Sequence, residues 1–211
     1  MTDSYDLNEL REELLTLGAA TLYEASGWDT FLPPQIRPAW PGARIVGRAL
    51  PVKAAAGDNL PLHLAVERAQ PGDVLVVDAG GAPHGYWGEV LAVAAQSRGV
   101  LGLVIHGGVR DVDRLEELGF AAFSSLIALQ GTLKDDAGTV GDAIRIGTAS
   151  IEEGDIVIAD RDGVAVIPAG IFADTLEYAR ARALREEQYM NRLRDGELTM
   201  DLLGLRLPAE P

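Results

Sequence analysis

Cysteine is absent from this chain of 211 residues, and lysine is nearly absent, with Lys53 and Lys134 as its only copies. The lack of cysteine excludes disulfides, thiolate metal ligands and cysteine nucleophiles, and it favours a cytoplasmic protein. No run of about eighteen uncharged apolar residues occurs, so we expect no membrane span. The first residues are polar and acidic rather than basic and then apolar, so we also expect no secretory leader.

Positive charge is scarce: 18 Lys and Arg stand against 32 Asp and Glu, for a formal net charge of −14. Because binding a nucleic-acid backbone needs clustered basic residues, we expect no nucleic-acid partner. A small anion remains compatible with this charge, since one arginine and a metal ion can reverse the sign inside a single pocket. The 47% hydrophobic content is enough for one sizeable core, so we expect residues 1–211 to form one domain.

Apolar periodicity and turn residues predict a mixed α/β fold with some antiparallel strand pairing. Expected helices cover 7–17, 21–26, 60–69 and 171–194, and two further helices start at Glu89 and at Arg110. Expected strands cover 43–52, 73–77, 101–105, 120–123, 142–146, 156–159 and 164–167. Residues 171–211 form a C-terminal helical extension in this interpretation.

Glycine-rich segments next to predicted strands and helices carry the chemistry. Gly85-Tyr86-Trp87-Gly88-Glu89 leads into one predicted helix, and His106-Gly107-Gly108-Val109-Arg110-Asp111, interpreted as a turn after a strand, leads into another. Ligands of open α/β sheets collect at such strand ends, and free N–H groups at a helix start can hold an anion. Asp111 is a hard oxygen donor for Mg²⁺ or Mn²⁺, and Arg110 is a planar fork for a carboxylate. The pair therefore predicts an anionic, metal-chelating substrate.

A purely structural explanation of the same residues stays open. An Arg-Asp pair at a helix start is commonly a charge interaction with the helix end, and Glu89 could simply favour a helix dipole. Asp113 is the alternative metal ligand if Asp111 faces away. The candidates of lower rank, as substrate contacts, turn residues or pocket borders, are His84, His106, Asp58 and Asn59.

Glu89, twenty intervening residues and Arg110-Asp111 resemble the acid-X20-Arg-Asp signature of the RraA-like family. This family includes the 4-hydroxy-4-methyl-2-oxoglutarate/4-carboxy-4-hydroxy-2-oxoadipate aldolases. Further matches at 57–60, 71–78 and 154–164 extend the resemblance over most of residues 15–205. It implies a mixed α/β sandwich similar to swivelling domains, with a C-terminal helical extension. It also implies homotrimers, sometimes paired as homohexamers, with active sites at subunit clefts.

The resemblance assigns roles to individual positions. In the family's aldolases the aspartate binds the divalent metal largely through water, which falls on Asp111, and the arginine steadies the enolate, which falls on Arg110. The first acid of the signature, usually aspartate, orients water and is here Glu89, one methylene longer. The positions expected to bind substrate are Arg110, Gly88, Glu89, Val90 and Leu91.

A glutamate from a neighbouring subunit completes the site in these aldolases. Glu186 is the best positional match and Glu187 the next, whereas composition alone predicts that this stretch is the solvated face of an amphipathic helix.

We therefore expect a class II, metal-dependent lyase that cleaves 4-hydroxy-2-oxo di- or tricarboxylic acids to pyruvate and a second 2-oxo acid, with oxaloacetate decarboxylase activity. Mg²⁺ or Mn²⁺ is the expected cofactor, acting as a Lewis acid. The alternative aldolase strategy is a lysine Schiff base, and we expect neither Lys53 nor Lys134 near the glycine-rich segments.

Two other functions are alternatives to this lyase. One is a protein-binding regulator similar to the family members that inhibit ribonuclease E, although those look shorter at the C-terminus and can lack the acid after the arginine. The other is a methyltransferase, which is disfavoured because no GxGxG nucleotide-binding loop follows a strand.

Overall fold

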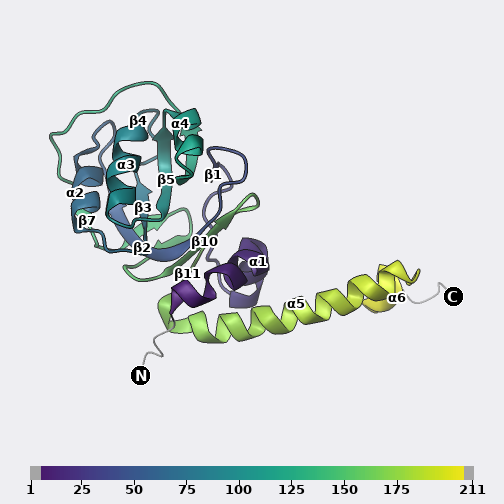
Figure 1. Ribbon diagram of the computed structural model, residues 1–211. Coiled ribbons are helices and arrows are strands. Elements are labelled where there is room, and N and C mark those ends of the chain that lie inside the picture. The colour runs from purple at the N-terminus through teal and green to yellow at the C-terminus, as the bar shows by residue number, and fades with distance from the viewer. Residues whose placement is uncertain (1–5, 207–211) are drawn as a thin grey trace.

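The computed structural model describes residues 6–206, which form a mixed α/β body with one long helix extending from it (Figure 1). Residues 1–5, which bear on the expected absence of a leader, and residues 207–211, the end of the expected extension, lie outside the described residues. Within 6–206, every helix is too short or too polar to cross a membrane.

A nine-stranded mixed sheet forms the centre of the body, in the order β1-β6-β5-β3-β2-β10-β11, with β4 beside β5 and β7 beside β2. Strands β2 to β6 pair in parallel, whereas β1, β7, β10 and β11 join antiparallel, which confirms the predicted α/β class. The bounds are β1 Arg37–Pro38, β2 Ile45–Lys53, β3 Asp73–Asp78, β4 Gly85–Trp87, β5 Gly102–Val109, β6 Ala121–Ile127, β7 Thr139–Val140, β10 Ile156–Asp160 and β11 Gly163–Ile167. A separate hairpin joins β8 Ile144–Ile146 to β9 Ala149–Ile151.

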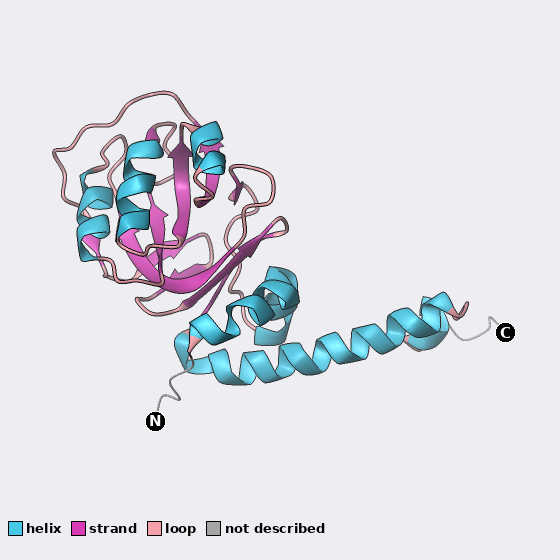
Figure 2. Ribbon diagram, in the orientation of Figure 1, coloured by secondary structure: helices cyan, strands magenta, loops and turns pink. Residues whose placement is uncertain are grey.

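Both faces of the sheet are buried, which explains why its central strands read as continuous apolar runs. Leu75 and Val77 of β3 pack under three helices, which are α2 (Leu60–Arg68), α3 (Glu89–Ser97) and α4 (Val112–Glu117) (Figure 2). Val74 and Val76 point to the opposite face, toward the 31–43 segment and the β8-β9 hairpin. Successive side chains of β3 therefore point alternately to the face covered by the helices, the helix side, and to the face covered by the hairpin, the hairpin side.

The N-terminal helix α1 (Leu7–Ser26) is broken at Gly18, whose φ of 80° and ψ of 162° are far from helical. Asp160 at the end of β10 restarts the helix, because its Oδ2 accepts a hydrogen bond from the Ala19 amide at 2.8 Å. The two helices predicted for this region are thus confirmed as two halves of α1.

The C-terminal helix α5 (Phe172–Arg194) follows the short turn η1 (Ala169–Ile171) and packs its first half on α1. Its second half leaves the body and leads to α6 (Thr199–Leu202) (Figure 1). The predicted C-terminal helical extension is confirmed for the described residues.

One local prediction was wrong: His106-Gly107-Gly108 is no turn but part of β5, which runs on to Val109 through a bulge. The glycines serve close packing, because a Cβ at Gly108 would lie 2.4 Å from the carbonyl oxygen of His84. The strands absent from the prediction, β1, β4, β7 and β9, have only two or three residues each, too few to show periodicity.

Candidate functional site

A cleft of about 300 Å³ lies on the helix side of the sheet, between α2, α3, the start of α4 and residues 128–138. We name residues 128–138, which connect β6 to β7, the cleft loop; Figure 1 shows it arching over the body from the β6 side toward α2. The residues lining the cleft are Asn59, His63, Gly85, Tyr86, Gly88, Val90, Leu91, Arg110, Asp111, Gly131, Thr132 and Lys134.

Asp111 turns the chain from β5 into α4 and caps a different helix. Its backbone is left-handed, at φ 55° and ψ 38°, unlike every other non-glycine residue in the described range 6–206. Its Oδ2 accepts a hydrogen bond from the Glu89 amide at 3.1 Å, where the N-cap residue Gly88 has no side chain to do so. The carboxylate therefore sits at the positive end of α3, which stabilises its charge.

Gly88 is required by this arrangement. A Cβ at position 88 would lie 2.3 Å from Asp111 Oδ2, so any larger residue would displace the carboxylate. Gly85 is similarly enclosed, since its Cβ would lie 2.6 Å from the Ala128 carbonyl oxygen and 3.0 Å from Arg110 Cδ. Gly85 in β4 and Gly88 directly after it thus leave room for Arg110 and Asp111 to lie close to the start of α3.

Arg110 lines the cleft beside Asp111. Its backbone amide donates to the Trp87 carbonyl oxygen at 2.9 Å, which fixes the main chain beside β4. Its Nε lies 3.8 Å from Asp111 Oδ2, and the two side chains are 48% and 41% exposed. An ion pair that is so long and so exposed is weak, so the fork of Arg110 remains available to an anion.

The oxygen donors in the cleft fit only a divalent ion that keeps most of its water. Within residues 6–206, no three His, Asp or Glu side chains come together in a way that could hold a metal. Asp111 supplies one carboxylate, whereas the Asn59 Oδ1, which has no hydrogen-bond partner in the described structure, is buried and not exposed to the cleft. Mg²⁺ tolerates such a sparse set of protein ligands because it commonly retains several waters and completes its shell with substrate oxygens.

Lys134 lies on the cleft wall, so the expectation that both lysines are remote from the glycine-rich segments is wrong for Lys134. The cleft loop brings it there, and no local sequence signal showed this, because the loop has no periodicity. Thr132 reaches the cleft from the same loop. Lys53 lies on the opposite side of the sheet and pairs with Asp78.

His63 of α2 also lines the cleft. Burial lowers its pKa, and the nearby charge of Lys134 lowers it further. His63 is therefore neutral at pH 7 and can donate or accept a hydrogen bond without adding charge.

Glu89, Val90 and Leu91 form the first turn of α3. Val90 and Leu91 line the cleft, whereas the Glu89 side chain is exposed and is not among the lining residues. Glu89 faces Arg114 of α4 closely enough that its charge, after the hydrogen bond and charge of Glu117, helps to raise the pKa of that guanidinium. Glu89 thus lies at the rim.

The alternative acid Asp113 is exposed in the first turn of α4 and does not line the cleft. His84 packs beside Tyr86, with ring centroids 6.0 Å apart, and its buried Nδ1 has no hydrogen-bond partner in the described structure. Asn59 does line the cleft, and its Nδ2 donates to the Tyr86 carbonyl oxygen at 3.0 Å. Asp58 is buried outside the lining, and backbone amides occupy its carboxylate.

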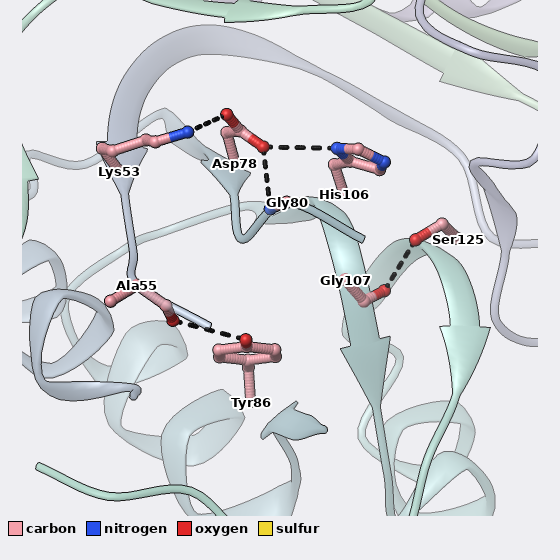
Figure 3. A network of polar contacts seen from close by, with 8 residues as sticks. All are labelled: Lys53, Ala55, Asp78, Gly80, Tyr86, His106, Gly107 and Ser125. Carbon is pink, nitrogen blue, oxygen red and sulfur yellow. Dashed lines mark hydrogen bonds and ion pairs between the residues drawn. The ribbon is translucent and has the colours of Figure 1, made fainter. Parts of the chain in front are cut away.

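His106 belongs to a polar row on the hairpin side of the sheet (Figure 3). Its Nδ1 lies 3.2 Å from Asp78 Oδ1, and Lys53 Nζ bonds the other carboxylate oxygen. Burial raises the pKa of Asp78, but hydrogen bonds from Lys53, the Gly80 amide and His106 outweigh it, so the net shift is downward. The row is separate from the cleft, and His106 is not among the lining residues.

Glu186 and Glu187 lie on α5, which projects away from the cleft of the same chain (Figure 1). Glu186 Oε1 is 2.8 Å from Arg182 Nη2, and Arg182 also pairs with Glu24 of α1. Glu187 is exposed. Neither glutamate reaches the cleft within one chain.

Comparison with known proteins links this geometry to a family. The sequence model of the RraA-like family, described as Aldolase/RraA, matches residues 19–166. A protein of Halalkalibacterium halodurans provisionally named 4-hydroxy-4-methyl-2-oxoglutarate aldolase is 31% identical over 173 residues, which cover 82% of each chain. The 4-hydroxy-4-methyl-2-oxoglutarate aldolase of Thermus thermophilus is 29% identical over 127 residues, 60% of this chain and 77% of that one.

Solved structures give a second kind of relative. A Streptomyces coelicolor protein described as an unusual member of the RNase ES inhibitor RraA protein family superposes with a TM-score of 0.73 at 26% identity. The match covers 88% of this chain and 96% of that one, so the likeness includes nearly the whole fold.

Proposed function

The chain belongs to the RraA-like family, and from this premise we propose that it is a lyase acting on 2-oxo acids in the cleft around Arg110 and Asp111. The proposed reaction splits a 4-hydroxy-2-oxo di- or tricarboxylic acid into pyruvate and a second 2-oxo acid, and the same site would decarboxylate oxaloacetate. The observation that carries the proposal is the convergence of Arg110, Asp111, the α3 N-terminus and Lys134 on one cleft. A cytoplasmic location stays a prediction from the cysteine-free composition.

Arg110 and α3 are suited to the pyruvate end of the substrate. The guanidinium fork can hold a carboxylate through two parallel hydrogen bonds, and the amides of Val90 and Leu91 belong to the unpaired first turn of α3. Bond cleavage leaves negative charge on the 2-oxo oxygen, and a fixed cation beside that atom lowers the barrier. Arg110 takes this role because it cannot lose its own charge at neutral pH.

Lys134 and Thr132 are suited to the far end of the substrate. Both residues line the same cleft as Arg110, so the lysine ammonium would pair with a second carboxylate and the threonine hydroxyl would add a hydrogen bond. Neutral His63 can contact the 4-hydroxyl group or the far carboxylate as a hydrogen-bond donor. This division predicts a preference for diacids over pyruvate-like monoacids.

A divalent cation, Mg²⁺ or Mn²⁺, would supply Lewis-acid polarisation of the 2-oxo group when bound, with Asp111 as its protein ligand. The hydrogen bond from the Glu89 amide at the α3 N-terminus holds the Asp111 carboxylate in place for this task. In this proposal Glu89, at the rim, would orient water that accepts the 4-hydroxyl proton. Glu186 of a second copy, in a trimer or hexamer, would complete this water-holding side.

The test is release of pyruvate from oxaloacetate and from a 4-hydroxy-2-oxo diacid, with added Mg²⁺ or Mn²⁺ and then with a chelator. We expect turnover only with metal, and Asp111→Asn should reduce it by at least about a hundredfold. Asp113→Asn is the matched control, because it removes an equal charge two residues away and outside the cleft. Full activity in the chelator, or equal losses in both variants, would overturn the assignment.

The position of Lys134 makes a Schiff base a necessary control. Borohydride treatment in the presence of pyruvate reduces a lysine imine and adds a stable mass to the chain. We expect no such adduct, because Lys134 pairs with a carboxylate in our proposal. An adduct on Lys134 would replace the metal-dependent route.

Likeness to the Streptomyces coelicolor ribonuclease-inhibitor relative supports a second candidate function, a protein-binding regulator of ribonuclease activity without catalysis. A regulator would use its outer surface, so Asp111→Asn should leave ribonuclease inhibition intact. Inhibition of ribonuclease by a protein that shows no turnover on any 2-oxo acid would favour this function.

A further inference from the structure

Asp58 is buried, with 5% of its surface exposed, yet it lies outside the lining of the cleft. Its carboxylate accepts three hydrogen bonds from backbone amides. Oδ1 accepts from Leu60 at 2.9 Å, at the start of α2, and Oδ2 accepts from Asp135 at 2.7 Å and from Asp136 at 3.0 Å. One side chain therefore joins the first turn of α2 to the cleft loop.

The cleft loop is otherwise held by backbone pairs before Lys134. The Gly85 amide donates to the Gln130 carbonyl oxygen at 2.8 Å, and Leu133 exchanges bonds with Gly57 and Asn59 at 2.8 and 3.0 Å. Lys134 follows Leu133 directly. The Asp58 bonds fix the chain immediately after it, so Lys134 stands between two anchored points.

We propose that Asp58 is a positioning residue for the substrate's far carboxylate: it clamps the cleft loop to α2 and thereby sets where Lys134 and Thr132 meet the substrate. The inference rests on the proposed function for its consequence in catalysis. The clamp itself is a property of the fold and can be measured without any substrate.

Charge supports the clamp. Burial alone raises the pKa of Asp58, but the amides of Asp135, Leu60 and Asp136, followed by the charge of Lys134, shift it below its ordinary value. The carboxylate is therefore ionised at neutral pH, and charge-assisted hydrogen bonds are stronger than neutral ones. An asparagine here would keep one accepting oxygen and replace the other by an NH₂ group, which cannot accept a hydrogen bond. It could therefore bind the Leu60 amide or the amides of Asp135 and Asp136, but not both.

The experiment compares Asp58→Asn with the control Asp142→Asn, which makes the same charge change at an exposed position. Hydrogen exchange of the segment 131–136 reports the clamp, and steady-state kinetics with oxaloacetate report its effect. In Asp58→Asn we expect exchange about tenfold faster, KM raised about tenfold and kcat changed less than threefold, because the Arg110 end stays intact.

Each outcome decides a separate claim. Unchanged exchange in a folded Asp58→Asn protein overturns the clamp, and faster exchange with unchanged KM overturns its role in substrate positioning. If the parent protein releases no pyruvate, the proposed function fails while the exchange result still judges the clamp.

A second variant covers the case in which Asp58→Asn does not fold. Asp136→Pro removes one amide donor to Asp58, together with the Asp136 Oδ1 that accepts from the Gly138 amide, and it leaves the bond from the Leu60 amide to Asp58 in place. We expect the same direction of change in exchange and KM, with a smaller size. No change in either measurement would count against the clamp.

Discussion

At the scale of single residues, the Asp111 carboxylate has a structural task, and we propose that it has a chemical task as well. Its Oδ2 caps α3 through the Glu89 amide, whereas the described residues offer no hydrogen bond to its Oδ1. The capping explanation and the metal explanation of the Arg-Asp pair are therefore compatible. The cap holds the carboxylate at a fixed place, and preorganised groups are what catalysis requires.

Gly88→Ala tests this placement directly. The backbone of Gly88 is extended, at φ −161°, so alanine is tolerated locally, but its Cβ would meet Asp111 Oδ2. We expect turnover to fall by at least about tenfold as the carboxylate moves, with a loss of about 1 kcal/mol in unfolding free energy from the weakened cap.

Pyruvate release and urea unfolding measure the two effects. Gly170→Ala is the control, because a Cβ there meets nothing within 4 Å. Unchanged turnover in Gly88→Ala would show that the position of the Asp111 carboxylate does not matter.

At the scale of elements, Lys53, Asp78 and His106 form a row that ties the C-terminal ends of β2 and β3 to the C-terminal half of β5. The register places these residues opposite one another in adjacent parallel strands. The Asp78 carboxylate is buried, whereas the side chains of Lys53 and His106 are partly exposed to water. The row therefore stabilises the three strands by pairing one buried negative charge with two partners that remain solvated. The row lies on the hairpin side of these strands, whereas the cleft lies on their helix side.

This row predicts a pH dependence of stability. The folded pKa of Asp78 lies below its value in the unfolded chain, about 3.9. Its contribution is therefore fully present above that value and is lost as the pH falls through the lower folded pKa. Asp78→Asn should reduce the unfolding free energy by about 1–2 kcal/mol at pH 7, and the difference from the parent should shrink below about pH 4.

Urea unfolding of both proteins between pH 7 and pH 3 checks this expectation. Asp29→Asn serves as an exposed control. A difference that stays constant with pH would mean that the variant acts through packing and not through charge.

At the scale of the whole molecule, α5 and α6 form an arm whose direction is set by α1. Arg180 pairs with Glu13 through two hydrogen bonds at 2.5 and 2.7 Å, and Arg182 pairs with Glu24. Beyond these contacts the arm exposes apolar side chains by 46–62%: Leu184, Met190, Leu198, Leu203 and Leu205. Such exposure on a projecting helix suits association with a second copy.

Mixed oligomers test whether the arm completes a neighbour's cleft. Asp111→Ala removes the proposed metal ligand of one site, and Glu186→Gln removes the carboxylate that a neighbour would donate. Co-assembled variants should regain a measurable fraction of turnover, because some sites combine an intact Asp111 with an intact Glu186.

Each variant measured alone should be inactive. Mass measurement of the mixed sample tests whether its oligomers contain subunits of both variants. Proven exchange without recovery would remove Glu186 from the site.

The sequence by itself determined the fold class, the main helices and strands and the family. These follow from local periodicity, glycine positions and the fixed spacing between Glu89 and Arg110-Asp111, which are carried by neighbouring residues or short motifs. Even the break in α1 could be predicted, because Gly18 interrupts two helical patterns.

Tertiary structure alone decided which polar residues share the cleft. Lys134 enters it because backbone pairs and Asp58 hold an aperiodic loop across α2, and His106 leaves it because strand alternation turns it toward Asp78. The Asp111 carboxylate meets the amide of Glu89, 22 positions away, because β4 and β5 lie side by side. These contacts join segments that are distant in the chain, so they form only when the strands and the cleft loop pack together, which the periodicity of one segment does not specify.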